Sequence, residues 1–364
     1  MNRDEILTWL REEDPEKLQG LWTLADTARQ QGVGDAVHLR GLIELSSHCV
    51  RSCAYCGLRC GRKPLSRYRM SPDEVVDCAR QGIRLGYGTV VLQTGEDPGL
   101  RAPDVAEIVR RIKALPTESG VPLAVTLSLG ERADDELALW KQAGANRYLL
   151  RFETSDPLLF ARIHPSLPGR PSDRVAMLRR LRTLGYEIGS GVMVGIPGQA
   201  WGTLADDLLL FRELDLDMIG IGPYLPHPDT PLGRGDPGFG PLEPGQQVPS
   251  TAQMTCKAVA IARILCPQAN IPSTTALATL DPDHGREDGL SRGANVVMPN
   301  LTPVRYREKY DIYPDKACLH ETAETCAGCL RGRIEQLGRV VGSGQGGRMG
   351  TEACSSVAQI AVSG

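Results

Sequence analysis

The sequence lacks the long apolar runs that mark secreted and membrane-spanning proteins. Its opening stretch, MNRDEILTWLREEDPEKLQG, is charged throughout and contains no apolar segment typical of a signal peptide. No stretch of about 18 uninterrupted apolar residues follows, so we expect no transmembrane helix. We therefore expect a cytoplasmic protein. In that reducing compartment, clustered cysteines bind metal or do redox chemistry more often than they form structural disulfides.

The sequence also lacks a strong charge of either sign and an even number of cysteines. The net charge is −3 over 364 residues, which provides no basic surface for nucleic acid, so we expect no nucleic-acid partner. The chain has 11 cysteines, and an odd count weakens the interpretation as a disulfide framework. What remains is a globular enzyme or a binding protein that uses its thiols.

Strand-like apolar segments alternate with helical ones along most of the chain. The helix that opens at SPDEVV shows the expected signals, since Ser71 can cap it and Pro72 takes its first position. Such alternation is typical of parallel strands joined by helices, and eight units predict an α/β fold with a (β/α)8 TIM-type barrel. An open doubly wound sheet is the alternative. The eight candidate strands are residues 39–47, 88–96, 122–131, 146–155, 186–198, 216–226, 270–280 and 293–303.

Four segments divide the chain. Residues 1–38 predict an N-terminal extension of two short helices, and residues 39–313 form the barrel. Residues 314–342 make a C-terminal extension that carries further cysteines, and residues 343–364 are small and polar, as in a flexible tail.

The segment CVRSCAYCGLRC follows the first predicted strand directly and carries Cys49, Cys53 and Cys56. Chemistry in such barrels gathers at the carboxyl ends of the strands, so we expect these thiols at the catalytic mouth. Three thiolates can hold a 4Fe–4S cluster and leave one iron open. A zinc site with Cys60 as the fourth ligand is the alternative. Otherwise Cys60 is an unliganded thiol.

The spacing Cys-x3-Cys-x2-Cys, with Tyr55 before the last cysteine, resembles the radical SAM superfamily. The resemblance implies a 4Fe–4S cluster whose open iron binds S-adenosylmethionine, and reductive cleavage of that cofactor to a 5′-deoxyadenosyl radical. It also implies cofactor contacts near the ends of successive strands. Besides Tyr55, the candidates for these contacts are Gly95, Glu96, Thr126, Ser128, Arg151, Glu153, Arg174 and Met193.

Longer stretches resemble one family within that superfamily, the FeFe-hydrogenase maturase HydE family. RYRMSPDEV, LQTGEDP and above all GPYLPHPDTPL carry this resemblance, which extends from Cys49 to about Tyr313. It implies assembly of the diiron subcluster of the hydrogenase from an iron–cysteinate precursor. Companion maturases and a reductase or ferredoxin as electron donor are the implied partners. The substrate candidates are Thr274, Thr275, Met298 and Tyr313.

The C-terminal segment CLHETAETCAGC supplies Cys318, Cys326 and Cys329. Their spacing resembles the auxiliary cluster site of part of the HydE family, and zinc or an empty site is as compatible with the sequence. Because they follow the last predicted strand, we expect a site separate from the catalytic mouth and dispensable for radical formation.

Three rival functions remain. Two are related radical SAM enzymes, a mutase like methylornithine synthase and a sulfur enzyme like biotin synthase. GPYLPHPDTPL argues against both, and the other barrel cysteines (Cys78, Cys256 and Cys266) lie on helical patterns typical of core packing. The third rival is a non-enzymatic iron–sulfur carrier, which would not need a complete barrel.

Overall fold

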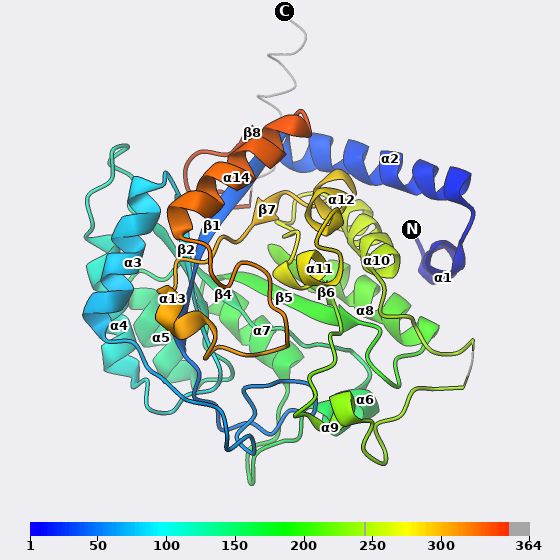
Figure 1. Cartoon of the computed structure of the whole chain (residues 1–364), viewed down its shortest axis with the longest axis horizontal. Helices are drawn as coiled ribbons and strands as arrows, with labels where there is room; N and C mark the ends of the chain where they lie inside the picture. Colours follow the sequence, from blue (N-terminus) through cyan, green and yellow to red (C-terminus); the bar gives the residue numbers. More distant parts are fainter. Residues whose placement is uncertain (244, 349–364) are drawn as a thin grey trace, which may run out of the picture.

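Parallel strands alternate with helices along the chain, and the helices cover the outside of the strands (Figure 1). The structure is a computed structural model that describes residues 1–243 and 245–348. The strands are β1 (Ala36–Ser46), β2 (Thr89–Thr94), β3 (Ala124–Ser128), β4 (Arg147–Leu149), β5 (Glu187–Val194), β6 (Met218–Pro223), β7 (Val296–Val297) and β8 (Val340–Val341). The helices are α1 (Arg3–Arg11), α2 (Pro15–Val33), α3 (Pro72–Arg84), α4 (Ala102–Lys113), α5 (Asp134–Gln142), α6 (Pro157–Ile163), α7 (Arg174–Thr183), α8 (Trp201–Glu213), α9 (Pro231–Arg234), α10 (Ala252–Leu265), α11 (Thr275–Leu280), α12 (Gly285–Ser291), α13 (Val304–Arg307) and α14 (Ala323–Gln336).

The sheet has the strand order β6-β5-β4-β3-β2-β1-β7, and every pair in it is parallel. Two isolated bridges close the ring, because Asn270 pairs with Met218 of β6 and Pro272 pairs with Val296 of β7. The segment from Asn270 to Pro272 therefore takes the place of the seventh barrel strand. The predicted (β/α)8 barrel is confirmed.

The predicted strand over residues 270–280 is wrong in its second half, where α11 forms. The Thr274 side chain accepts a hydrogen bond from the backbone N–H of Leu277 and so caps the helix. The alanines and leucines that follow are strong helix formers. Thr274 and Thr275 consequently lie at a helix start rather than on a strand.

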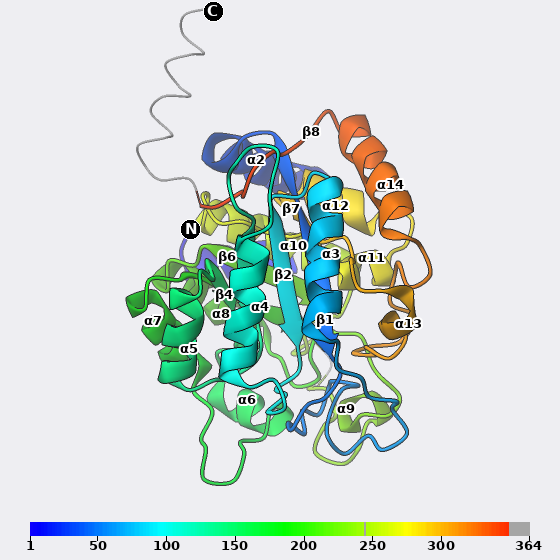
Figure 2. The same cartoon turned by 90° about the vertical axis from the view of Figure 1, so that its left-hand side faces the viewer.

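Local sequence signals place the outer helices. Ser71 is the N-cap of α3, as predicted, and it forms a capping box: its side chain accepts from the Glu74 N–H, and the Glu74 carboxylate accepts from the Ser71 N–H. Val75, Val76 and Ala79 on its inner face are buried against the barrel. Burial of each valine side chain stabilises the fold by about 1.5–3 kcal/mol. Figure 2 shows α3 and α4 lying over β1 and β2.

The N-terminal extension consists of two helices, of which α2 is longer than expected. The helix α2 packs against α10, and α1 packs against α8 and α10. The buried Lys257 of α10 donates a hydrogen bond to the carbonyl oxygen of Leu10 at 3.2 Å, which ties α1 to the barrel. The first barrel strand begins at Ala36, inside the segment assigned to the extension.

The chain after α14 returns to the amino-terminal end of the barrel. The short strand β8 pairs with the start of β1. Beyond it, the Gln345 carbonyl accepts from Arg147 at 3.1 Å, and the Gly346 carbonyl accepts from Arg40 at 2.8 Å. Both arginines are buried and need such acceptors. Residues 343–348, which we assigned to the tail, make these contacts, and the remainder of that tail (349–364) lies outside the described residues.

None of the described helices is long and apolar enough to cross a membrane.

Candidate active site

The three predicted cluster ligands lie together on the loop after β1, at the carboxyl end of the barrel. Cys53 is buried, and Cys49 and Cys56 are half-buried. Burial raises the pKa of the Cys56 thiol to about 12, and the neighbouring Cys49 adds to the effect. Burial and the other two thiols also raise the pKa of Cys53. The three thiols lie close enough to raise one another's pKa, and bound iron would supply the positive charge that lets them ionise, so this set fits an iron–sulfur cluster.

Backbone contacts with the loop after β2 hold one end of the cysteine loop. The Glu96 N–H donates to Cys49 Sγ at 3.4 Å, and the Val50 N–H donates to the Glu96 carbonyl at 2.9 Å. Gly95 directly precedes Glu96 in the loop after β2. A close approach to the backbone of Gly95 therefore does occur, and the residue that approaches it is Cys49.

The segment GPYLPHPDTPL, residues 222–232, holds the other end. The Leu232 N–H donates to the Ala54 carbonyl at 3.0 Å. His227 is buried, and its Nε2 lies 3.1 Å from Asp311 Oδ2. A Cβ on Gly57 would lie 2.7 Å from the His227 ring and 2.0 Å from the Asp311 carbonyl oxygen. The most specific sequence motif therefore packs on the cluster loop.

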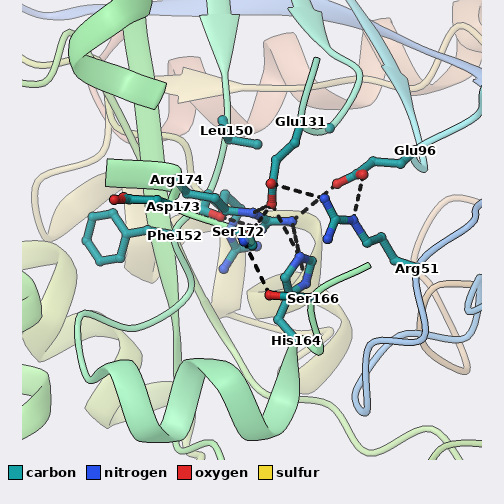
Figure 3. Close-up of polar contacts among 12 residues, drawn as sticks. Arg51, Glu96, Glu131, Leu150, Phe152, His164, Ser166, Ser172, Asp173 and Arg174 are labelled. Carbon is teal, nitrogen blue, oxygen red and sulfur yellow. Dashed lines mark hydrogen bonds and ion pairs between the residues drawn. The ribbon is translucent and has the colours of Figure 1, made fainter. Parts of the chain in front are cut away.

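A network of charged side chains joins the cysteine segment, through Arg51, to the ends of neighbouring strands (Figure 3). Arg51 contacts two carboxylates, with Nε 2.6 Å from Glu96 Oε2 and Nη2 3.0 Å from Glu131 Oε2. Arg174 Nε lies 3.0 Å from Glu131 Oε1, and Arg174 Nη1 donates to the Arg151 carbonyl at 2.6 Å. Because each charge has an opposite partner, the network can exist away from water.

Sequence reasoning missed three residues of this region: Arg51, Glu131 and His164. Arg51 lies inside the cysteine motif, and Glu131 ends the third predicted strand in TLSLGE, so their positions carried a signal. His164 follows α6 in a segment with no recognisable pattern, and only the folded chain brings it to Cys53.

Glu96 and Arg174 differ in how they fit their predicted cofactor roles. Glu96 Oε1 is buried and has no hydrogen-bond donor among the described residues, so it can accept from an amino group. Arg174 directs its three nitrogen atoms at Glu131, the Arg151 carbonyl and His164. Its contact with the cofactor carboxylate stays a prediction.

A cavity of about 310 Å³ occupies the carboxyl end of the barrel. Of the candidate residues, those that line it are Tyr55, Cys56, Arg151, Glu153, Met193, Thr274, Thr275, Met298 and Tyr313. All four substrate candidates are therefore on one cavity with Cys56. Gly95, Glu96, Thr126, Ser128 and Arg174 do not line it. The Thr126 hydroxyl is buried without a hydrogen-bond partner among the described residues.

Arg151 and Glu153 both face this cavity although β4 ends before them. Glu153 lies four residues beyond the end of β4, has a φ of 65°, and makes one isolated bridge to Val192 of β5. Arg151 Nη2 lies 3.2 Å from Glu153 Oε2 and donates to the Val192 carbonyl at 2.6 Å. The Arg151 side chain is 32% exposed, so it can reach a molecule in the cavity.

The C-terminal extension forms part of the cavity wall. Lys316 enters the barrel and lies 2.8 Å from the buried Glu44 of β1. Cys318 and Cys326 line the same cavity, contrary to the expected separation, whereas Cys329 is exposed on α14. The Cys326 thiol hydrogen-bonds Cys318 and lowers its pKa, and Arg286 acts in the same direction. The two sulfurs are therefore close together.

The comparison with known proteins agrees with this site. Residues 43–211 match the family model of the Radical SAM superfamily, a stretch that contains the three cysteines, Glu96 and Arg174. The protein is a radical SAM enzyme, and its superfamily uses a 4Fe–4S cluster and S-adenosylmethionine.

The particular family follows from a curated relative. Over 330 residues the chain is 47% identical to the FeFe hydrogenase maturase subunit HydE of Thermotoga maritima, covering 91% of this chain and 89% of that protein. The chain belongs to the HydE family. The 3-methylornithine synthase of Methanosarcina acetivorans is 28% identical, over 85% of this chain and 83% of its own.

A solved structure supports the fold alone. The crystal structure of a methylornithine synthase matches with a TM-score of 0.75 at 23% identity and covers 94% of each chain.

Proposed function

We propose that this protein acts in the maturation of FeFe hydrogenase, as a radical SAM enzyme whose cluster is held by Cys49, Cys53 and Cys56. The observation that carries the proposal is the 47% identity with a hydrogenase maturase along nearly the whole chain. The geometry supports it, because the cysteine loop opens through Tyr55 and Cys56 onto a cavity inside the barrel.

When bound, the reduced cluster supplies one electron that cleaves S-adenosylmethionine to methionine and a 5′-deoxyadenosyl radical. The chain's own residues bind and orient the reactants. Glu96 Oε1, which has no hydrogen-bond donor among the described residues and lies 3.7 Å from Arg174 Nη2, is a buried acceptor for the cofactor's amino group. Met193 lies on the wall of the cavity for an apolar contact. The barrel excludes water around them, which protects a reactive radical.

The cavity suits a small anionic substrate such as an iron–cysteinate precursor. Arg151 and Arg286 line it, and Lys316 lies on its wall in an ion pair with Glu44. A carboxylate or cyanide ligand can accept hydrogen bonds from these donors. Thr274 and Thr275 lie at the start of α11 on the same wall, and Met298 and Tyr313 add apolar surface.

Companion hydrogenase maturases would supply and receive the iron compound, and a reductase or ferredoxin would supply the electron. The sulfurs of Cys318, Cys326 and Cys329 would hold a second metal centre. Two of these cysteines line the cavity, so this centre would border the substrate chamber.

The proposal is tested in two stages. The anaerobically reconstituted protein is incubated with S-adenosylmethionine and dithionite, and 5′-deoxyadenosine is measured. We expect product from the native chain and from C60A, whose thiol is exposed, and none from C53A. Full activity of C53A would disprove the cluster assignment, and no product from the native chain would leave an iron–sulfur carrier as the interpretation.

The second stage measures hydrogenase activity after the apo-hydrogenase is incubated with the companion maturases, with and without this protein. We expect activation only with the native chain. If 5′-deoxyadenosine forms but hydrogenase is not activated, the protein is a radical SAM enzyme of another pathway, and formation of 3-methylornithine is then the next assay. The lower identity with the methylornithine synthase makes that outcome the weaker candidate.

A further inference from the structure

One buried imidazole contacts a predicted cluster ligand. His164 follows the last residue of α6 and is fully buried. Its Nδ1 lies 3.0 Å from Cys53 Sγ. The other two sulfurs accept hydrogen bonds from the backbone alone, Cys49 from Glu96 and Arg51, and Cys56 from Leu58. Within the described part of the chain, His164 is therefore the only side chain that hydrogen-bonds a sulfur of the cysteine motif.

The surroundings fix this ring in one position. Arg174 Nη2 lies 3.0 Å from His164 Nε2 and 3.5 Å from Nδ1, so the guanidinium rests against the imidazole. The Phe160 ring packs on another side, with 5.0 Å between the ring centroids. Figure 3 shows the imidazole pointing from the end of α6 toward the charged network. A ring held on several sides keeps its nitrogen aimed at Cys53 without a large entropy cost.

The protonation state follows from the chemistry of the partner. Arg174 Nη2 can only donate, and it lies 3.0 Å from His164 Nε2, so Nε2 accepts and the ring carries its one proton on Nδ1. Glu131 Oε1 lies farther from Nε2, at 3.4 Å. A thiolate bound to iron has no proton to donate. The hydrogen bond can then form only with the proton on His164 Nδ1 and the Cys53 sulfur as acceptor.

We propose that His164 is a positioning residue of the cluster, which donates its Nδ1–H to the Cys53 thiolate, orients that ligand and raises the reduction potential of the cluster. A hydrogen bond draws electron density from the sulfur and so favours the more negative, reduced state of the cluster. The proposal rests on the cluster that the superfamily implies and not on hydrogenase as the target.

The test compares reduction potentials of the reconstituted 4Fe–4S cluster in S-adenosylmethionine-free protein, by redox titration followed by the EPR signal of the reduced state. H164L removes the donor, whereas H164N keeps a side-chain N–H at the δ position. The matched control is S172A, which removes the hydrogen bond from Ser172 to Glu131 in the same network without touching Cys53. We expect a more negative potential for H164L, a return toward the native value for H164N, and no change for S172A.

An unchanged potential in cluster-loaded H164L would overturn the proposal, and so would an H164N potential as negative as that of H164L. Iron and sulfide content establish loading. If H164L does not hold a cluster, H164F, which also lacks a donor but keeps a ring of similar size, replaces it, and its potential is interpreted in the same way. If the native protein fails to activate hydrogenase, the proposed function is refuted. The reduction potentials still test the role of His164, because they depend only on the cluster.

Discussion

Gly95 and Cys49 lie closer together than any other residue type at position 95 would allow. A Cβ at Gly95 would lie 2.6 Å from Cys49 Cβ, 2.8 Å from the His48 carbonyl oxygen and 3.1 Å from Cys49 Sγ. Real Cβ atoms do not approach other heavy atoms so closely. The loop after β2 therefore fixes the position of the first cluster ligand through the absence of a side chain.

We predict that G95A loses the cluster while the barrel remains folded. The added methyl group must displace Cys49 or the loop, and such overpacking costs about 1–3 kcal/mol. Iron per chain and 5′-deoxyadenosine formation should both fall strongly. The control is G20A on α2, where a Cβ meets nothing within 4 Å, and which should keep the iron and gain about 0.5–1 kcal/mol of stability. Full iron loading of G95A would show that the loop can move to accommodate the methyl group, and would contradict the prediction.

Arg51 is the second target, because it contacts the buried carboxylate of Glu96 and the half-buried carboxylate of Glu131. R51M removes the closest partner of Glu96 and leaves it Arg174 at 3.7 Å, whereas Glu131 keeps Arg174 at 3.0 Å. Removing one partner of a buried ion pair costs up to about 3–5 kcal/mol. We expect a lower unfolding free energy in denaturant titrations and loss of S-adenosylmethionine cleavage. The control R101M breaks the exposed pair with Asp104 and should leave both unchanged. Equal stability of R51M and the native chain would contradict this prediction.

The sequence predicted those features that local pattern and motif spacing encode. The barrel, the cap at Ser71 and the placement of Cys49, Cys53 and Cys56 after the first strand follow from periodicity and order along the chain. The Thr274 segment was misassigned because β-branched residues suggest a strand, whereas a cap hydrogen bond to Leu277 decided for a helix.

Contacts between distant segments could not be predicted. His164 meets Cys53 across 111 positions, and the partners of Arg51 lie 45 and 80 positions away. Cys318 lines the cavity two residues after Lys316, which pairs with Glu44 of β1. No local sequence pattern predicts that ion pair. Such pairings depend on how the loops pack at the barrel mouth, and a single sequence does not record that packing.

The cysteines of the C-terminal extension give a third prediction. Cys318 and Cys326 line the cavity, but Cys49, Cys53 and Cys56 lie on another loop, so C318A/C326A/C329A should still form 5′-deoxyadenosine. Iron or zinc per chain should fall relative to the native protein, as measured by elemental analysis. The single variant C60A should retain all its metal. Complete loss of cleavage in a folded triple variant would show that the two sites depend on each other.

Arg151 is the last target, because it faces the cavity with partial exposure and a single carboxylate nearby. A charge-assisted hydrogen bond contributes about 1.5–3 kcal/mol, which corresponds to one to two decades in binding. We expect R151M to keep the fold and the cluster and to weaken binding of S-adenosylmethionine or of the anionic substrate by roughly tenfold or more. The control R179M removes an exposed arginine that pairs with Glu213 and should change neither property. Melting temperature and S-adenosylmethionine affinity are measured on the same reconstituted samples, and the substrate arm uses hydrogenase activation. If the melting temperature of R151M falls while both binding readouts stay native, Arg151 serves the scaffold through Glu153 and the Val192 carbonyl, and its assignment to the site is wrong.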